Sequence, residues 1–310
     1  MSPAPSLVSG AIPASIFLIL SLACFYLMDI VSLIIKFPSP TASGFFEWDN
    51  GTLPILDNFH WLRPLDPVIR EITPGFAPSS FGYDDFGGGG VIVPVYYFAY
   101  LAFTPPTRSQ PLSERKIDIH GAIIWSVLVV LFHVIPVVGI MFDTTLEDRH
   151  WWTWFWQLYS VRITLSWYII RFFGWFITLP TLHSTLSYRT KTTLILAPFI
   201  AIALGFWTYT ALYCPYSLSM IFFPYSLAVD TWVSRMRRLL QFDQLFIFGS
   251  SVLWVAMDMR RNGSSSAIKI LFAAVVLAGV VGTGASFGLV WLWREWQLVS
   301  DGEKDTSKTE

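Results

Sequence analysis

The sequence predicts an all-α membrane protein, a polytopic bundle of about seven transmembrane helices. Hydrophobic residues make up 54% of the 310 residues. Only 13% are charged, whereas a water-facing protein normally carries roughly 25% charged residues. The hydrophobic residues also gather in runs close to the roughly 20 residues that a helix needs to cross the hydrocarbon core of a bilayer. Membrane lipid is therefore the expected surroundings of this chain.

Seven apolar stretches are long enough, or nearly so, to cross a membrane. The first has no basic residue before it and is longer than the core of a signal peptide, so we expect it to remain as an anchor. The second is the weakest, because it opens with four glycines and contains Pro94. Together the spans are expected to form a single transmembrane domain over residues 1–300. The expected spans are 11–35, 87–104, 120–142, 151–180, 193–214, 241–259 and 268–292.

The segments outside these spans carry weaker signals. Residues 44–86 mix prolines, glycines and acids with aromatic residues, and 53–72 are typical of amphipathic helices lying on the membrane surface. Residues 301–310 are polar and predict a disordered tail. Basic residues divide almost evenly between the two faces, so the orientation stays open. Glycosylation triplets begin at Asn50 and Asn262, and seven crossings would place them on opposite faces, so that only one could be modified.

Two arginines lie inside the fourth span. A charge at membrane depth costs several kcal/mol and usually faces a cavity or a partner, so each is a candidate site. Arg162 and Arg171 are nine residues apart, which places them on opposite sides of an unbroken helix. Two interpretations apply to either residue. In the first, the side chain reaches the membrane interface or forms a structural pair with another residue. In the second, it anchors an anion or a phenolate.

The acids of the spans allow similar alternatives. Asp243 opens the sixth predicted span, where the positive end of the helix dipole favours an acid. The other reading is a buried carboxyl, which stays protonated in an apolar pocket and is ready to donate its proton. Asp29 and Asp258 fit positions at the membrane interface. Acids before the second span, among them Asp66 and Asp84, are expected to be solvated by default.

Several classes of site are excluded by composition and motifs. The net charge of −1 offers no basic surface for nucleic acid. His120 and His133 are thirteen residues apart, and no HxxxH pair occurs, so no metal site is expected. The chain also lacks an aspartate-rich diphosphate motif, a Walker loop and a GxGxxG fingerprint followed by an acid. We therefore expect no cofactor.

Aromatic residues form two dense clusters, one at 151–156 and one at 96–100. Most such clusters are interfacial belts of membrane proteins. Aromatic faces also stabilise cations, by about 2 kcal/mol or more where water is absent. The second property would suit carbocation chemistry.

Five short motifs, in this order, resemble the fungal membrane-bound terpene cyclases of the ascochlorin, ascofuranone and macrophorin pathways. The likeness runs roughly from residue 60 to 298. In the family pattern an additional span separates the Phe-Ala-Pro-Ser region of the first motif from the second motif. Here only residues 82–93 lie between FAPSSF and PVYYF, so one helix of the family bundle is expected to be missing. The motifs are FAPSSFGYD at 76–84, PVYYF at 94–98, RHWWTWFWQ at 149–157, LQFDQLFIFGSSVLW at 240–254 and WLWRE at 291–295.

The resemblance implies a metal-independent enzyme of the isomerase or lyase type, which cyclises the epoxidised prenyl chain of a meroterpenoid by protonation. Asp243 would be the proton donor, with Asp84, Asp66 and Glu295 as second choices for acid, orienting group or terminal base. The residues that would line the cation path or hold the polar head of the substrate are Tyr96, Tyr97, Trp154, Trp156, Gln157 and Arg162.

The same resemblance implies the partners of the protein. The substrate would be a lipophilic prenylated aromatic or quinone-like compound of secondary metabolism. A prenyltransferase and an epoxidase of the pathway would share the membrane, expected to be the endoplasmic reticulum. The alternative is a non-catalytic membrane carrier or scaffold for lipophilic intermediates. A membrane prenyltransferase is disfavoured, because aspartate-rich motifs are missing.

Overall fold

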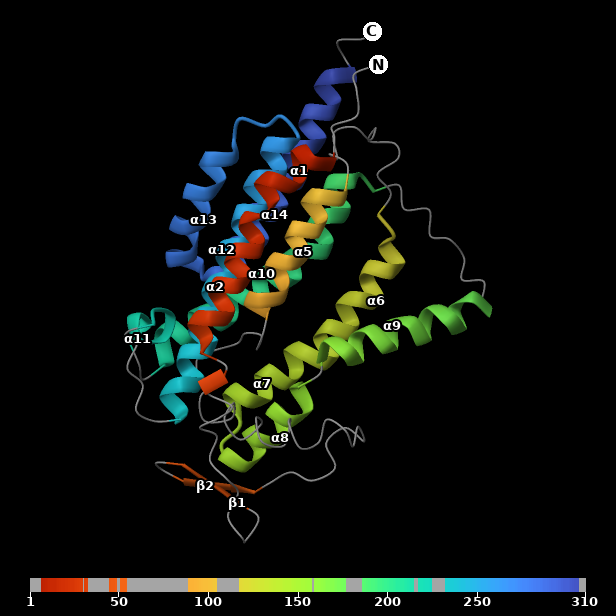
Figure 1. The fold of residues 1–310 in the computed structure, drawn as a ribbon. Helices are drawn as coiled ribbons and strands as arrows, with labels where there is room; N and C mark the ends of the chain where they lie inside the picture. Colours follow the sequence, from red (N-terminus) through yellow and green to blue (C-terminus); the bar gives the residue numbers. More distant parts are fainter. Residues whose placement is uncertain are drawn as a thin grey trace.

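A computed structural model describes residues 7–29, 31–32, 45–48, 51–54, 89–104, 117–157, 159–176, 186–214, 217–224 and 232–306. This part of the chain is helical apart from one antiparallel hairpin of two strands (Figure 1). The hairpin consists of β1 (Phe45–Trp48) and β2 (Gly51–Pro54). The helices are α1 (Leu7–Ala14), α2 (Ile16–Met28), α5 (Gly89–Phe103), α6 (Ile119–Val129), the π-helical turn η4 (Val130–Val134), α7 (Ile135–Phe142), α8 (Leu146–Trp156), α9 (Tyr159–Phe176), α10 (Tyr188–Tyr213), α11 (Leu218–Phe222), α12 (Trp232–Arg261), α13 (Ala267–Val281) and α14 (Thr283–Thr306).

The predicted membrane bundle is confirmed in its helical character, but the count of seven spans is not. Four helical stretches of the described residues are long and apolar enough to cross a bilayer. Two further apolar helices, Val91–Phe103 and Ala267–Val281, are shorter. The four long stretches are Ala11–Met28, Ile119–Phe142, Tyr188–Tyr213 and Arg237–Arg261.

The stretch 268–292, predicted as one span, is two helices. α13 ends at Val281 and α14 starts at Thr283, with Gly282 between them at a φ of 82°. Glycine adopts this left-handed conformation without the steric cost that a side chain would bring. A Cβ at Gly282 would also lie 2.8 Å from the Trp207 side chain. A hydrophobicity window cannot detect a turn of one residue, and this explains the error.

Other predicted boundaries are corrected in the same way. The fourth predicted span, 151–180, is divided between α8, which ends at Trp156, and α9, which starts at Tyr159. α14 continues to Thr306, so the first part of the predicted disordered tail is helical. Most of the predicted interfacial segment lies outside the described residues, and the hairpin is its described part.

Side chains at three helix starts explain why these helices begin where they do. Asp118 accepts a hydrogen bond from the backbone N–H of Gly121 at the start of α6. Thr145 caps α8, whose first turn carries two acids. Ser187 caps α10 in the same manner. Each cap satisfies an N–H group that has no partner within the helix.

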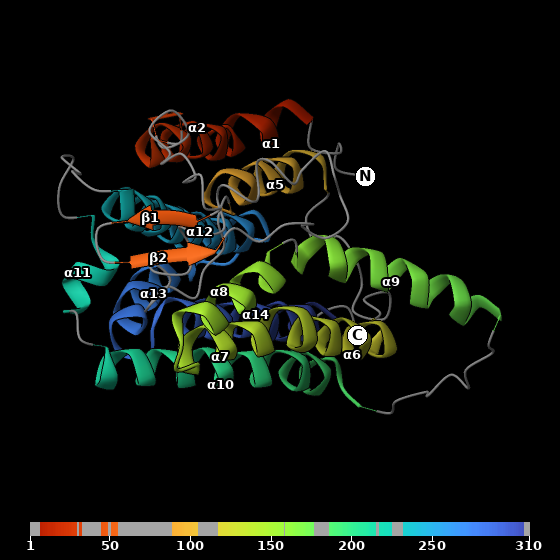
Figure 2. The ribbon, with the colours of Figure 1, turned by 90° about the horizontal axis from the view of Figure 1, so that it is seen from below.

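The core of the bundle is built around α12. In Figure 2 the helices form layers, with α1 and α2 outermost, then α5, α12, the pair α13 and α14, and α10. Buried residues from six of these helices make one hydrophobic cluster about Val255 and Met259, which are fully buried. The outer faces of α2, α10 and α13 carry exposed apolar side chains, as expected of helices in lipid. α12 is thus the central helix of the core, and the buried side chains of the other helices pack against it.

A second group of helices lies beside this core. α7 packs on α8, where the Trp152 indole lies against Gly139 and donates to Asp143 at 3.1 Å. α6 packs on α9, and α9 extends away from the bundle in Figure 1. A groove lies between the helices α6 and α9.

Candidate functional site

A buried network of charged side chains joins α12 to α14. Arg294 on α14 donates to Asp258 on α12 through Nε at 2.9 Å and also through Nη2. Its Nη1 pairs with Glu295, the next residue along α14. Asp258 is fully buried, and Arg294 and Glu295 are 5% and 8% exposed. Buried charges of this kind are stable only when they are paired, and here each has an opposite charge in contact.

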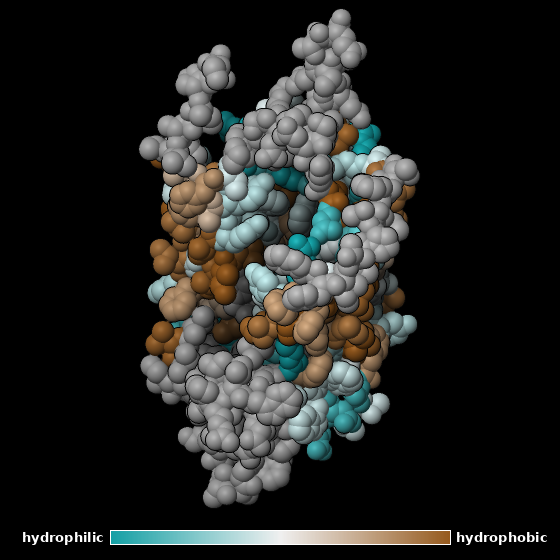
Figure 3. All heavy atoms as spheres, turned by 90° about the vertical axis from the view of Figure 1, so that its right-hand side faces the viewer, coloured by the Kyte–Doolittle hydropathy of each residue, from teal (hydrophilic) through white to brown (hydrophobic). Residues whose placement is uncertain are grey.

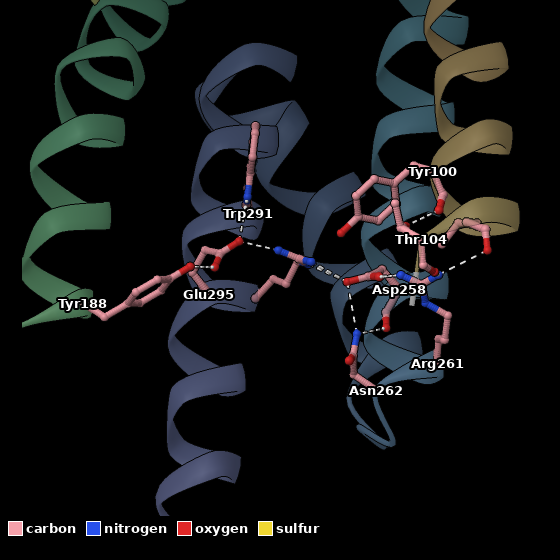
Figure 4. A network of polar contacts seen from close by, with 10 residues as sticks. Tyr100, Thr104, Tyr188, Asp258, Arg261, Asn262, Trp291 and Glu295 are labelled. Carbon is pink, nitrogen blue, oxygen red and sulfur yellow. Dashed lines mark hydrogen bonds and ion pairs between the residues drawn. The ribbon is translucent and has the colours of Figure 1, made fainter. Parts of the chain in front are cut away.

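The network reaches α10 through Glu295. The Tyr188 hydroxyl, in the first turn of α10, donates to Oε2 of Glu295 at 2.8 Å. The Trp291 indole donates to Oε1 at 3.0 Å (Figure 4). Glu295 thus accepts hydrogen bonds from a phenol, an indole and the Arg294 guanidinium, which fix the orientation of its carboxyl group.

The other side of the network reaches α5 through Arg261. Its Nη2 pairs with Oδ1 of Asp258 at 2.7 Å. Its Nη1 donates to the backbone oxygens of Leu101 and Thr104 at 3.2 and 2.8 Å, at the C-terminal end of α5. One guanidinium therefore satisfies carbonyl groups that a helix end leaves without a partner. Four helices, α5, α10, α12 and α14, meet in this network.

A column of aromatic rings borders the charged groups. Tyr97 stacks on Trp254 with ring centroids 4.9 Å apart, and its hydroxyl is 2.8 Å from Ser251 Oγ. Trp254 meets Trp291 edge to face at 6.0 Å. The Arg294 guanidinium lies 5.2 Å from the Trp254 ring centre, a cation–π distance. The rings separate the charges from lipid and hold the guanidinium.

Figure 3 shows the side of the molecule from which α9 extends in Figure 1. Hydrophilic and apolar residues are mixed on this face.

Asp243 does not belong to this network. It lies on α12 fifteen residues before Asp258, roughly 22 Å along the helix. It is fully buried and sits eleven residues after the start of α12, so the reading that it begins a span beside the helix dipole is wrong. Its surroundings include the hydrophobic cluster formed by Leu240, Phe242 and residues of α2. The structure therefore shows that Asp243 is buried, and its role as a proton donor stays a prediction.

The remaining predicted residues fall into separate places. Glu295 belongs to the network and Tyr97 borders it, whereas Tyr96 is 60% exposed. Trp154, Trp156, Gln157 and Arg162 lie on or beside α8 and α9. The Trp156 indole donates to Nδ1 of His133 at 3.0 Å. Arg162 donates to the backbone oxygen of Phe155 and lies 4.4 Å from its ring centre. The described residues of the predicted set thus do not share one chamber.

Three of the predicted positions, Asp66, Asp84 and Asn50, lie outside the described residues. The other glycosylation candidate, Asn262, is 3% exposed. Its amide donates to the backbone oxygen of Asp258 at 2.7 Å and to Oδ2 at 3.2 Å. A glycan would replace one of the two hydrogens on this nitrogen, so at least one of these contacts would have to break.

Sequence reasoning missed the centre of the network. The sequence predicts Asp258 to be an interface residue, because two arginines follow it near the end of its span, and it indicates no separate role for Arg294. The available signal was the pair of opposite charges, Arg294 and Glu295, within an apolar helix rich in tryptophan, where unpaired charges would be costly.

The described residues do not fit a metal ion or a dinucleotide. They contain no cluster of three or more His, Cys, Asp or Glu side chains that could hold a metal. A dinucleotide site of the common type needs a parallel strand, a glycine-rich turn and a helix. Gly89 and Gly90 open α5, but the strands described in this chain pair only with each other, antiparallel.

The chain is similar over most of its length to part of two fungal proteins that are named as FAD-dependent monooxygenases. The chain is 25% identical over 245 residues to the FAD-dependent monooxygenase verC1 of Penicillium polonicum, covering 76% of this chain and 30% of that protein. It is 26% identical over 228 residues to the FAD-dependent monooxygenase anuJ of Penicillium roqueforti (strain FM164), covering 69% of this chain and 28% of that protein. The chain thus spans less than a third of the length of these curated relatives. No family model and no solved structure matches the chain.

These relatives correct the functional expectations drawn from the motifs. Both are named as monooxygenases and neither as a terpene cyclase, so the resemblance, the cyclase activity and the isomerase or lyase class are wrong. The alternative of a non-catalytic carrier is not supported either. The physical reason is that the motifs consist mainly of aromatic and apolar residues, which pack membrane helices in proteins of many activities.

Proposed function

We propose that this chain is the membrane-embedded part of a flavin-dependent monooxygenase system. The proposal is supported by the similarity to two FAD-dependent monooxygenases over most of this chain. The described residues do not fit FAD, and more than two thirds of each relative lies outside the match. The flavin would therefore be held by another domain or another polypeptide, and the present residues would act on the substrate.

The contribution of this chain is to bind a lipophilic substrate within the bilayer. The observation that carries this role is the buried network of Asp258, Arg294 and Glu295 beside stacked aromatic rings. Apolar walls with a few fixed polar groups bind and orient a compound that has a greasy body and a polar head. The Tyr188 hydroxyl, held by Glu295, is the polar group best placed to meet such a head.

The substrate class follows from these walls. Lipophilic aromatic or quinone-like compounds, including prenylated ones, match an interior with stacked Tyr and Trp rings. The proposed setting is fungal secondary metabolism in the endoplasmic reticulum membrane. Other membrane enzymes of the same pathway, such as a prenyltransferase and an epoxidase, would supply or consume these compounds.

An oxygen-isotope experiment tests the proposal. Membranes would contain this chain, a form of verC1 lacking the matching region, or both, together with NADPH, FAD, a prenylated phenol and ¹⁸O₂. We expect ¹⁸O in the product only when both polypeptides are present. Full-length verC1 is the positive control. The Tyr188→Phe variant of this chain should weaken substrate binding, measured as an increased KM.

Two outcomes would contradict the proposal. One is product formation by this chain alone without incorporation of ¹⁸O. The other is a rate of oxygen incorporation that stays the same when this chain is added, both with intact verC1 and with its shortened form.

A further inference from the structure

The groove between α6 and α9 is separate from the buried network. Its volume is about 540 Å³. It lies on the second group of helices, on the side of the molecule from which α9 extends in Figure 1. Most of the lining is apolar, and one fixed charge faces it, that of Arg171. The lining residues are His120, Gly121, Ile124, Tyr168, Ile170, Arg171, Phe172 and Gly174.

The arginine is held at one end of the groove. Nη1 of Arg171 is 3.1 Å from Oδ2 of Asp118, and both side chains are more than half exposed. The guanidinium also lies 5.3 Å from the Trp167 ring centre. Asp118 is itself fixed, because its other oxygen caps α6. A guanidinium carries five N–H donors and can hold two carboxylates at once.

The polar end of the groove lies where a membrane span begins. Asp118 immediately precedes the stretch Ile119–Phe142, which is long and apolar enough to cross a bilayer. Arg171 is therefore at the level of the membrane surface, where long basic side chains place their charge. Ile124 and Tyr168 continue the groove from this end along the two helices.

Size and charge together select the occupant. Pockets of roughly 300–1,000 Å³ hold single small molecules, and this groove falls in that range. A diacyl phospholipid brings two chains and a bulky headgroup. A single hydrocarbon chain ending in a carboxylate matches an apolar groove with one guanidinium at its surface end.

We propose that the α6–α9 groove binds a single-chain lipid carboxylate, such as a long-chain fatty acid, with its carboxylate on Arg171 and its chain along Ile124 and Tyr168. This site is independent of the proposed monooxygenation and is separate from the Glu295 network. Its test requires no turnover.

Photolabelling with a fatty acid that carries a diazirine in its chain tests the site. The full chain would be labelled in lipid nanodiscs, and the attachment points mapped by mass spectrometry. We expect labels in α6 and α9 that excess oleate removes. Arg171→Gln should reduce the labelling by about tenfold, because a charge-assisted contact is lost. The Arg189→Gln variant, which removes another exposed arginine, should label normally.

A pair of glycine variants separates a specific site from general contact with lipid. A Cβ at Gly174 or at Gly205 meets nothing within 4 Å, so both positions accept a larger side chain. Gly174 lines the groove, whereas Gly205 is on α10. Gly174→Leu should abolish labelling of α6 and α9, and Gly205→Leu should leave it unchanged.

Three results would overturn the proposal. The first is equal labelling of α6 and α9 in the Gly174→Leu and Gly205→Leu proteins, which is the behaviour of annular lipid. The second is equal labelling by the fatty acid and by the matching fatty alcohol, with no effect of Arg171→Gln. The third is labelling by a photoreactive phospholipid that depends on Gly174 while the fatty acid does not label.

Discussion

Asp258 is the residue on which the buried network depends. It receives hydrogen bonds from Arg294, Arg261 and Asn262, which come from two helices and the turn after α12. Removing it would leave the largely buried Arg261 without its carboxylate and Arg294 with Glu295 alone. Removing one partner of a buried ion pair is far more costly than replacing both partners by apolar residues.

We therefore predict that Asp258→Leu destabilises the protein strongly. Breaking a buried pair typically costs about 3–5 kcal/mol, because the remaining charge stays desolvated. The measurement is the unfolding midpoint in detergent, followed by circular dichroism. Glu147→Gln, at an exposed acid in the first turn of α8, is the control and should change the midpoint little.

The double variant Asp258→Leu, Arg294→Leu should recover part of the loss, because it removes both a carboxylate and a guanidinium. An unchanged midpoint in the single variant would show that Asp258 does not hold these arginines in the folded protein.

At this scale the sequence identified some residues and missed others. Glu295 and Tyr97 could be singled out because each lies in one of the five short motifs. Asp258 and Arg294 could not be paired, because they are 36 positions apart and only the packing of α12 on α14 brings them together. Tyr96 and Tyr97 are neighbours in sequence, yet one is mostly exposed and the other buried, since adjacent residues of a helix point in different directions.

At the scale of elements, glycines determine how closely α10 and α14 approach. Gly284 and Gly288 face Ala203 and Ile200 on α10. Small residues at such positions allow two membrane helices to pack backbone against side chain, where van der Waals contact drives their association. A sequence window sees these glycines only as weak helix formers and does not show which helix they face.

We predict that Gly288→Leu forces α10 away from α14. A Cβ at Gly288 would lie 2.5 Å from Cγ1 of Ile200, so the neighbour must shift. Overpacking of this kind costs about 1–3 kcal/mol. The unfolding midpoint should fall, and Ile200→Ala in the same protein should restore much of it.

Gly279→Leu is the matched control, because a Cβ there meets nothing within 4 Å. If Gly279→Leu lowers the midpoint as much as Gly288→Leu does, loss of a glycine and not crowding is the cause, and the packing argument fails.

For the whole molecule, the pairing of helices fixes which ends lie together. Tyr188 and Arg189, at the start of α10, contact Glu295 and Ser300 near the end of α14. Trp207, near the other end of α10, contacts Val280 at the turn between α13 and α14. α10 and α14 therefore run antiparallel. The composition of the chain predicts a membrane bundle. The number of times the chain crosses the membrane depends on the turn at Gly282, which a count of apolar residues does not reveal.

The turn at Gly282 gives a prediction that separates this fold from a bundle in which 268–292 is one span. A single span would put Ser300 on the face opposite to Ser187. The helical hairpin of α13 and α14 returns the chain, so Ser187 and Ser300 lie on the same face, while Ser217 lies on the other. We therefore expect Ser187→Cys and Ser300→Cys to be labelled by a membrane-impermeant maleimide from the same side of sealed microsomes.

The labelling experiment needs a background without native thiols, so Cys24 and Cys214 are first changed to alanine. Ser217→Cys is the internal control and should be labelled only from the opposite side, or after the membrane is permeabilised. Labelling of Ser300→Cys together with Ser217→Cys would mean that the chain does not return at Gly282. The contacts of Glu295 with Tyr188 could not then form in the membrane, because the two residues would lie near opposite faces of the bilayer.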